Sequence, residues 1–153
     1  MKKTSLLLGL AALFVACSVQ REIVDIPIIF DEQRMELTKE YLLNRYNLDQ
    51  ETPEITPKMV VLHWTAIPSL KKSFEAFNRS TLPNWRPDLE NVSGLNVSSH
   101  FLVDQDGTIY RLMPETLMAR HTIGLNHCAI GIENVGGTEG MPLTTPQLRG
   151  NIY

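Results

Sequence analysis

The stretch Met59-Val-Val-Leu-His-Trp64 decides the fold of this chain. Four apolar residues run without a break into a histidine, a pattern that predicts a β-strand with two apolar faces in the centre of a sheet. A second stretch of this kind, Ala129-Ile-Gly-Ile-Glu133, ends in a carboxylate. We expect His63 and Glu133 to lie at the carboxyl ends of their strands, where α/β sheets place their binding sites.

The remaining pattern completes a mixed α/β domain. A β-hairpin is predicted over residues 98–104 and 108–112, because Asp106-Gly107 tolerates the positive φ of a tight turn. The resulting prediction is a central mixed β-sheet flanked by helices. Its strands are expected near residues 59–63, 98–104, 108–112 and 129–133. The first helix is expected over residues 31–46, with Met35, Leu42 and Tyr46 on its apolar stripe, and the second from Pro68-Ser69 to about Asn78. The last helix is expected to begin with Thr145 as its N-cap and Pro146 as its first residue.

Composition bounds the class of protein. The chain has 153 residues, of which 43% are hydrophobic, and this is enough for one packed domain. Its 14 basic and 17 acidic residues argue against a generic nucleic-acid binder.

The N-terminus resembles a bacterial lipoprotein signal. Two lysines precede an apolar run that is too short to span a bilayer comfortably, and this run ends at Ala16-Cys17. We expect residues 1–16 to be a signal peptide. Residues 17–57 would form a tether, at 18–27, and an N-terminal helix, and residues 58–153 would form the main domain. The acylated Cys17 would anchor the protein in a membrane of the cell envelope. Of the two membranes we prefer the outer one, with the protein on its periplasmic side. The alternatives are an uncleaved anchor and an export signal without lipid.

Two residues stand out as candidates for chemistry. The four histidines lack the His-Glu-x-x-His spacing of helical zinc sites, but His63 leaves a core strand and therefore needs a hydrogen bond or a metal. Glu133 shares the strand face of Ala129 and Gly131, which leave room for an approaching group, and a carboxylate there is able to act as a general base. The alternative for Glu133 is a solvated acid at a strand end.

Two other residue types are weaker candidates. Cys128 is a candidate ligand or nucleophile, although its apolar neighbours favour a small buried residue. Trp64 and Trp85 are candidates for stacking on a sugar ring, although aromatic residues near strand ends are commonly core residues.

Four motifs together resemble the zinc-dependent N-acetylmuramoyl-L-alanine amidases, the type-2 amidase or peptidoglycan-recognition fold. They occur in the order and at the spacing of that family, and the resemblance covers roughly residues 58–150. The motifs are Val60-Val-Leu-His-Trp-Thr65, Ser98-Ser-His-Phe-Leu-Val-Asp-Gln-Asp-Gly-Thr-Ile-Tyr-Arg-Leu112, Ala119-Arg-His-Thr122 and Asn126-His-Cys-Ala-Ile-Gly-Ile-Glu133.

The resemblance implies roles for individual residues. His63 falls on the first zinc ligand of the family and Glu133 on the catalytic glutamate of its bacterial branch. Ser99 occupies the position of a tyrosine in the phage and animal branch, which also favours the bacterial branch. The substrate-binding positions are His121, Asn126 and Trp64, whereas His100 matches a residue that is not a zinc ligand.

The other zinc ligands of the family have no counterpart in the sequence. The second zinc histidine, an oxyanion-stabilising lysine and the third ligand all follow the helix that begins at Thr145. We therefore expect them beyond Tyr153, and we expect the chain as printed to be incomplete, to bind zinc weakly and to lack activity, because a catalytic zinc needs three protein ligands.

The resemblance implies that the intact protein is a lipid-anchored enzyme that acts on peptidoglycan or muropeptides. It would hydrolyse the amide between N-acetylmuramic acid and L-alanine of the stem peptide, with Zn2+ as cofactor. One alternative is a non-catalytic peptidoglycan-binding lipoprotein that has lost the metal. A purely structural lipoprotein is the other, and it leaves His63 and Glu133 at strand ends without a reason.

Overall fold

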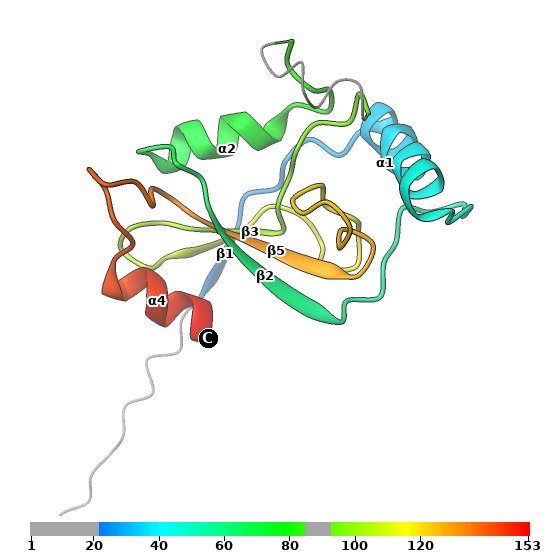
Figure 1. Ribbon diagram of the computed structural model, residues 1–153. Helices are drawn as coiled ribbons and strands as arrows, with labels where there is room; N and C mark the ends of the chain where they lie inside the picture. Colours follow the sequence, from blue (N-terminus) through cyan, green and yellow to red (C-terminus); the bar gives the residue numbers. More distant parts are fainter. Residues whose placement is uncertain (1–21, 85–92) are drawn as a thin grey trace, which may run out of the picture.

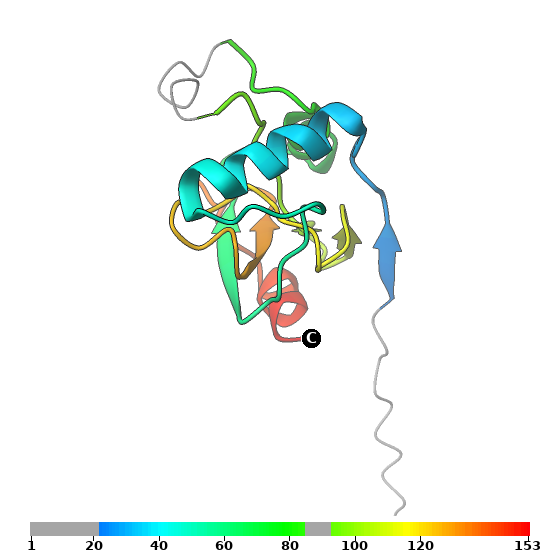
Figure 2. The ribbon, with the colours of Figure 1, turned by 90° about the vertical axis from the view of Figure 1, so that its right-hand side faces the viewer.

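The computed structural model describes residues 22–84 and 93–153 of the chain. Its strands are β1 (Ile23–Asp25), β2 (Met59–Trp64), β3 (Phe101–Val103), β4 (Ile109–Arg111) and β5 (Ala129–Asn134), and its helices are α1 (Glu32–Tyr46), α2 (Leu70–Asn78) and α4 (Thr145–Ile152). The strands form one mixed sheet in the order β1-β4-β3-β5-β2. Helices α1 and α2 lie over one face of the sheet and α4 lies on the other (Figures 1 and 2). The predicted mixed sheet flanked by helices is therefore confirmed.

The predicted hairpin is formed by the antiparallel strands β3 and β4. Its turn is closed by two backbone hydrogen bonds: Asp104 N donates to Thr108 O at 3.0 Å, and Gly107 N donates to Asp104 O at 2.8 Å. Gly107 has φ 85°, the left-handed conformation that the Asp-Gly pair predicts. Each strand has only three residues, fewer than the pattern predicted, although a backbone hydrogen bond from Leu112 N to His100 O at 2.8 Å continues the pairing beyond the strand ends.

The prediction that residues 59–64 form a central strand is wrong. Among the described residues β2 is the last strand of the sheet and pairs only with β5. Val60, Leu62 and Trp64 are 52–58% exposed, because α4 contacts the sheet mainly at β3, in the middle of that face. The unbroken apolar run therefore predicted the strand correctly, but the prediction that both of its faces are buried was wrong.

The N-terminal strand β1 was not predicted. It lies within the stretch assigned to a tether and pairs in parallel with β4, Ile23 opposite Ile109 and Asp25 opposite Arg111. Three residues are too few for a recognisable alternation, and the pairing depends on backbone groups that carry no sequence signal. The predicted signal peptide and Cys17 lie outside the described residues, as does Trp85.

Helix α1 begins as predicted, after Asp31, whose side chain accepts a hydrogen bond from Arg34 N. Its buried face differs from the predicted stripe and includes Arg34 and Thr38 as well as Tyr41 and Leu42. The Arg34 guanidinium donates to the backbone carbonyls of Phe77 (2.8 Å) and Arg79, so a charged side chain replaces an apolar one at this contact with α2. Burial lowers the pKa of Arg34 to about 10.

Helix α4 begins one residue earlier than predicted. Thr144, and not Thr145, is the N-cap, and it forms a capping box with Gln147. The buried Gln147 amide also donates to Val103 O at 3.1 Å and to Val135 O at 2.8 Å. These bonds join α4 to the ends of β3 and β5.

The core beneath α2 contains apolar residues from one side of this helix. Phe77, with Leu70 and Phe74, packs against Leu102 of β3 and Val135 after β5. Phe101, Val103 and Ile109 form a separate apolar cluster on the opposite face of the sheet. Residues 102 and 103 thus point to different faces, as the alternation of a strand requires.

A glycine in β5 allows a histidine ring to lie directly on the sheet. A Cβ atom at Gly131 would come within 2.6 Å of His121 Cγ and 2.9 Å of His121 Nδ1. No real Cβ makes such contacts, so the position of His121 requires the absence of a side chain at residue 131.

We therefore expect Gly131→Ala to destabilise the fold by about 1–3 kcal/mol, because the added methyl group overpacks a close contact. Urea denaturation measures the change. Gly140→Ala is the matched control, since a Cβ at Gly140 meets nothing within 4 Å. Equal stability of the two variants would contradict the close approach of His121 to β5.

Candidate functional site

The parallel pairing of β2 with β5 brings the two predicted residues together. His63 lies directly opposite Glu133 in the register, and paired residues of neighbouring strands project to the same face of the sheet. This is the face covered by α2 and not the face covered by α4 (Figure 1). Both residues lie near the carboxyl ends of their strands, as the sequence predicted.

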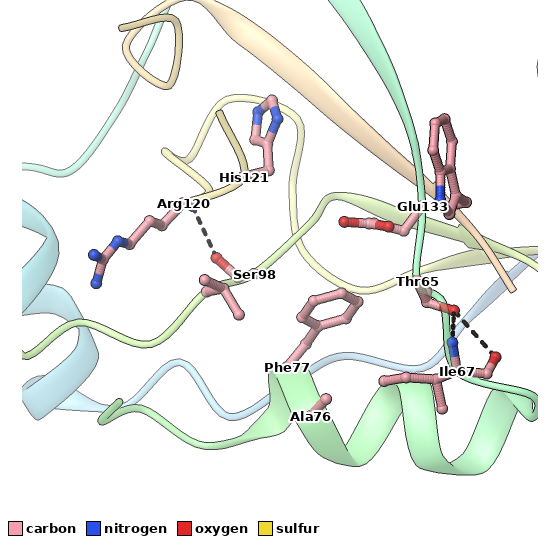
Figure 3. A pocket seen from close by; sticks show the side chains of 10 residues that line it. Thr65, Ile67, Ala76, Phe77, Ser98, Arg120, His121 and Glu133 are labelled. Carbon is pink, nitrogen blue, oxygen red and sulfur yellow. Dashed lines mark hydrogen bonds between the residues drawn. The ribbon is translucent and has the colours of Figure 1, made fainter. Parts of the chain in front are cut away.

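A cavity of about 440 Å³ opens in front of Glu133. Its walls come from the segment after β2, from α2, and from the loops that contain Ser98 and His121. Figure 3 shows the Glu133 carboxylate directed into this space, between Phe77 and His121. The Arg120 side chain points away from it in the same view.

The Glu133 carboxyl is poorly solvated and incompletely hydrogen-bonded. Its Oε2 atom is buried and has no hydrogen-bond partner among the described residues. Burial raises the pKa of Glu133 from 4.5 to about 7, because desolvation penalises the charged form. A carboxylate with a pKa near neutrality is able to accept and return a proton at physiological pH.

His63 belongs to a compact cluster with His121 and Thr122. His63 Nε2 lies 3.1 Å from His121 Nδ1 and 3.0 Å from Thr122 Oγ1. His121 Nδ1 lies 3.1 Å from the same hydroxyl. Three polar atoms from two distant segments of the chain therefore converge on one point.

Both histidines of this cluster favour the neutral form. The pKa of His121 is lowered to about 4, mainly by burial and to a smaller extent by the nearby His100 and His63, against the hydrogen bond to Ala129 O, which raises it. Burial also lowers the pKa of His63. A neutral imidazole has a free nitrogen lone pair, which is the form that binds zinc. The neutral nitrogen donor of His63 therefore suits the role of a single zinc ligand, which the resemblance implies for it.

The structure gives Asn126 a supporting position. Its Oδ1 accepts hydrogen bonds from His121 N at 2.9 Å and from Thr122 N at 2.7 Å, and its Nδ2 donates to Tyr41 Oη at 3.3 Å. The side chain is fully buried, so it fixes the backbone of residues 121 and 122. The resemblance implies that Asn126 lines or supports the substrate groove, and in the structure it supports the backbone of His121 and Thr122.

His100 is a structural residue. It is fully buried, its Nδ1 accepts a hydrogen bond from Gly131 N at 2.9 Å, and its Nε2 lies 2.8 Å from Leu117 O. Burial lowers its pKa, so the ring stays neutral and holds β5 against the loop before residue 119. Ser99, which occupies the position of the family's tyrosine, is also fully buried and donates to Gly131 O at 2.7 Å.

Trp64 lies at the rim of two hollows. It borders the cavity of Glu133 and a shallower hollow of about 250 Å³ with Pro142 and Leu143. The residue is 58% exposed, and Gly137 approaches it so closely that a Cβ there would lie 2.4 Å from Trp64 Cβ. An exposed indole beside a cavity is able to stack on a flat ligand.

The remaining candidates lie elsewhere. His127 stacks on Tyr46, with ring centroids 4.4 Å apart, and Cys128 is buried as predicted. Within residues 22–84 and 93–153 no group of three or more His, Cys, Asp or Glu side chains is placed to hold a metal. In the same part of the chain no helix has the length and apolar character needed to cross a membrane.

Thr122 belongs to the motif at residues 119–122, but no role was predicted for it from the sequence. Its place directly after His121 was a usable indication, since neighbouring residues in a loop are able to direct polar atoms to the same part of a site. The contact of Thr122 with His63 was not predictable, because the two residues are 59 positions apart and meet only in the folded chain.

Known proteins share this fold. "N-acetylmuramoyl-L-alanine amidase LysC" from Clostridium intestinale URNW is 22% identical, with 87% of this chain and 71% of that chain covered and a TM-score of 0.51. A selenomethionine derivative of AmpD is 20% identical, with 85% and 69% covered and a TM-score of 0.53. At these identities the similarity shows the fold alone.

A third solved structure is peptidoglycan recognition protein-LE in complex with tracheal cytotoxin, a monomeric diaminopimelic acid-type peptidoglycan. It is 22% identical, with 69% of this chain and 62% of that chain covered and a TM-score of 0.48. None of the curated proteins matches the chain.

The family model described as N-acetylmuramoyl-L-alanine amidase (Amidase_2) matches residues 53–151. This range includes β2, α2, β5 and all the residues that line the cavity in front of Glu133. It leaves β1 and α1 outside. Because the match covers more than half of the sequence, the chain belongs to the N-acetylmuramoyl-L-alanine amidase family.

Proposed function

We propose that the protein hydrolyses the amide bond between N-acetylmuramic acid and L-alanine of the peptidoglycan stem peptide. The observation that carries this proposal is the buried Glu133 carboxyl, which faces an open cavity with one oxygen unpartnered and lies opposite His63 in the sheet. Membership of the amidase family supports the reaction type. Structural packing alone gives no reason to desolvate a carboxylate at the floor of a cavity.

Glu133 is the general base of the proposed reaction. It accepts a proton from the attacking water as the C–O bond forms at the amide carbonyl. It then returns this proton to the nitrogen as the C–N bond breaks, which releases the lactyl carboxylic acid and the amine of L-alanine. A pKa of about 7 suits both transfers, because the same group must bind and release the proton.

Zinc is the proposed cofactor, and His63 is the ligand that the family resemblance assigns. A zinc ion held there would supply a Lewis acid for the carbonyl and for the water. The neutral form of His63 leaves a ring nitrogen lone pair available for the metal.

The substrate is proposed to lie in the cavity along α2. Phe77 supplies an apolar wall, and Ser98 and His121 supply polar groups on the opposite side (Figure 3). Trp64 offers an exposed ring at the rim for the glycan or the peptide. Asn126 contributes indirectly by holding the backbone of His121.

The anchor is a separate proposal, based on the sequence of residues 1–17. We propose that Cys17 is lipidated and that the domain hangs from the outer membrane into the periplasm, close to its substrate. The link between residues 17 and 22 is short, so β1 would lie close to the membrane surface.

We expect Glu133→Gln to lower the rate of amide hydrolysis about 10²- to 10⁴-fold, the usual contribution of a positioned general base. The assay uses the zinc-loaded protein and measures stem peptides released from purified peptidoglycan. Glu139→Gln, which removes an exposed acid, is the matched control. An active wild type with a fully active Glu133→Gln variant would remove Glu133 from the mechanism. Binding of peptidoglycan by the zinc-loaded wild type without any cleavage would instead support a binding protein.

The raised pKa of Glu133 also predicts a pH dependence of stability in the zinc-free protein. Between pH 4.5 and about 7 the unfolded state loses this proton and the folded state keeps it, so stability falls as the pH rises. Glu133→Gln removes this loss, and the variant should gain on the order of 2 kcal/mol over the wild type between pH 4.5 and pH 8. Urea denaturation at the two pH values tests this, and the Glu139→Gln control should show no such gain.

Lipidation predicts that Cys17→Ser releases the protein from the membrane fraction. Cys128→Ser is the control, because this thiol is buried in the domain and is not placed for acylation. Fractionation of cells that express each variant measures the effect. Retention of Cys17→Ser in the membrane would contradict the anchor and leave the amidase proposal untouched.

A further inference from the structure

Three polar atoms meet where the end of β2 faces the loop after residue 119. The distances from His63 Nε2 to His121 Nδ1, from His63 Nε2 to Thr122 Oγ1 and from His121 Nδ1 to Thr122 Oγ1 are 3.1, 3.0 and 3.1 Å. The proposed function uses the His63 ring as a zinc ligand and gives these contacts no role. A histidine binds zinc through one ring nitrogen, so the contacts of the other nitrogen determine which one is free for the metal.

The position of the proton on the His121 ring is fixed by a backbone carbonyl. His121 Nε2 lies 3.2 Å from Ala129 O, which has lone pairs and no hydrogen. The neutral His121 ring therefore carries its proton on Nε2 and donates it to this carbonyl. The other ring nitrogen, Nδ1, has a lone pair and is able only to accept a hydrogen bond.

The lone pair on His121 Nδ1 in turn fixes the tautomer of His63. If the His63 proton were on Nδ1, two nitrogen lone pairs would face each other across 3.1 Å, which is repulsive. With the proton on Nε2, His63 donates to His121 Nδ1. The Thr122 hydroxyl fits the same arrangement, because it is able to accept from His63 and to donate to His121. Only this tautomer places a hydrogen atom between the two rings.

We propose that His121 is a positioning residue for His63, and that it accepts the Nε2 proton of this ring so that Nδ1 is the nitrogen that binds zinc. The inference rests on the proposed function for the metal and for His63 as its ligand. It assigns no metal ligand to the loop after residue 119. His63 Nδ1 has no hydrogen-bond partner among the described residues, and the side chain is only half-buried, so its lone pair stays available.

The arrangement matches the usual surroundings of a zinc-bound histidine. Such a ring binds the metal with one nitrogen and donates the N–H of the other to an acceptor of the protein, which fixes the orientation of the ring and makes it a better ligand. Here the acceptor is a second imidazole, which itself donates to Ala129 O. Hydrogen bonds in such a chain polarise and strengthen one another.

The acceptor is held rigidly. The His121 ring lies against the bare backbone of Gly131, where a Cβ would come within 2.6 Å of His121 Cγ. Asn126 Oδ1 accepts hydrogen bonds from the backbone N–H groups of His121 and Thr122, at 2.9 and 2.7 Å. The nitrogen acceptor and the hydroxyl therefore keep their places relative to β5, and they orient the His63 ring without help from the metal.

The first measurement needs no metal. Long-range ¹H–¹⁵N NMR spectra of the zinc-free protein at mildly alkaline pH distinguish a protonated ring nitrogen from a bare one, and we expect the His63 proton on Nε2. His121→Phe keeps a ring over Gly131 and removes the acceptor, so the His63 proton should redistribute between its two nitrogens. His121→Asn places an amide oxygen near the position of Nδ1 and should restore the tautomer of the wild type.

A zinc titration then tests the metal. We expect zinc to shift the signal of His63 Nδ1 as the bound nitrogen, and His121→Phe to weaken zinc binding about 10- to 100-fold, the usual effect of losing such an acceptor. His127→Phe is the matched control, because this ring stacks on Tyr46 outside the cluster, and it should change neither the tautomer nor the affinity. Circular dichroism confirms that each variant is folded.

The outcomes separate this inference from the proposed function. A proton on His63 Nδ1 in the wild type, or zinc bound at Nε2, would overturn the inference and leave His63 as the ligand of the proposed function. An unchanged tautomer and affinity in His121→Phe would remove His121 from the arrangement with the same consequence. If zinc binds neither nitrogen of His63, both the inference and the assignment of His63 as a ligand are wrong.

Discussion

The parallel pairing of β2 with β5 is the constraint on which the site depends. It places His63 opposite Glu133, and hydrogen bonds extend the register beyond both ends of the strands, from Lys58 N to Cys128 O at 2.8 Å and from Thr65 N to Asn134 O at 2.9 Å. Side chains alternate between faces along a strand, so a slip of one residue would turn Glu133 towards α4 and away from the cavity. The backbone ladder therefore carries the geometry of the site before any side-chain contact is considered.

The wall opposite Glu133 depends on contacts outside the sheet. Arg120 donates to the backbone carbonyls of Ser93 and Leu95, and its guanidinium lies 5.3 Å from the ring of Tyr41 in α1. Tyr41 also accepts a hydrogen bond from Asn126, which fixes the loop of His121. Helix α1 precedes the part of the chain that matches the family, and yet it supports the groove. The N-terminal helix is therefore part of the same folded unit as the site.

Local patterns predicted most of the fold and failed where long-range contacts decide. The Asp106-Gly107 turn and the apolar strand runs are local features, and the structure contains both. The edge position of β2 depends on what covers its outer face, which no property of residues 59–64 encodes. The burial of Arg34 was not predicted either, because it depends on the backbone carbonyls of Phe77 and Arg79 at the end of α2, which accept its hydrogen bonds.

The candidate site was likewise predictable where it depends on local sequence, and not where it depends on long-range contacts. His63 and Glu133 were recognisable because polar residues that end apolar strands are rare and costly. The room beside Gly131 was also visible in the sequence, since a glycine in a strand indicates a close approach. Which group fills that room was not visible, because His121 reaches Gly131 from a loop whose path is set by Asn126.

A single physical cause connects the titratable groups of the cavity. Burial raises the pKa of Glu133 and lowers the pKa values of His63 and His121, so each group is pushed towards its neutral form. This leaves a pocket that is polar but weakly charged, with nitrogen lone pairs on one side and an unpartnered carboxyl oxygen on the other. A divalent cation reverses the balance, because it accepts a lone pair and favours the charged form of the acid. The zinc ion of the proposed function would therefore offset the cost of burying Glu133 without a partner.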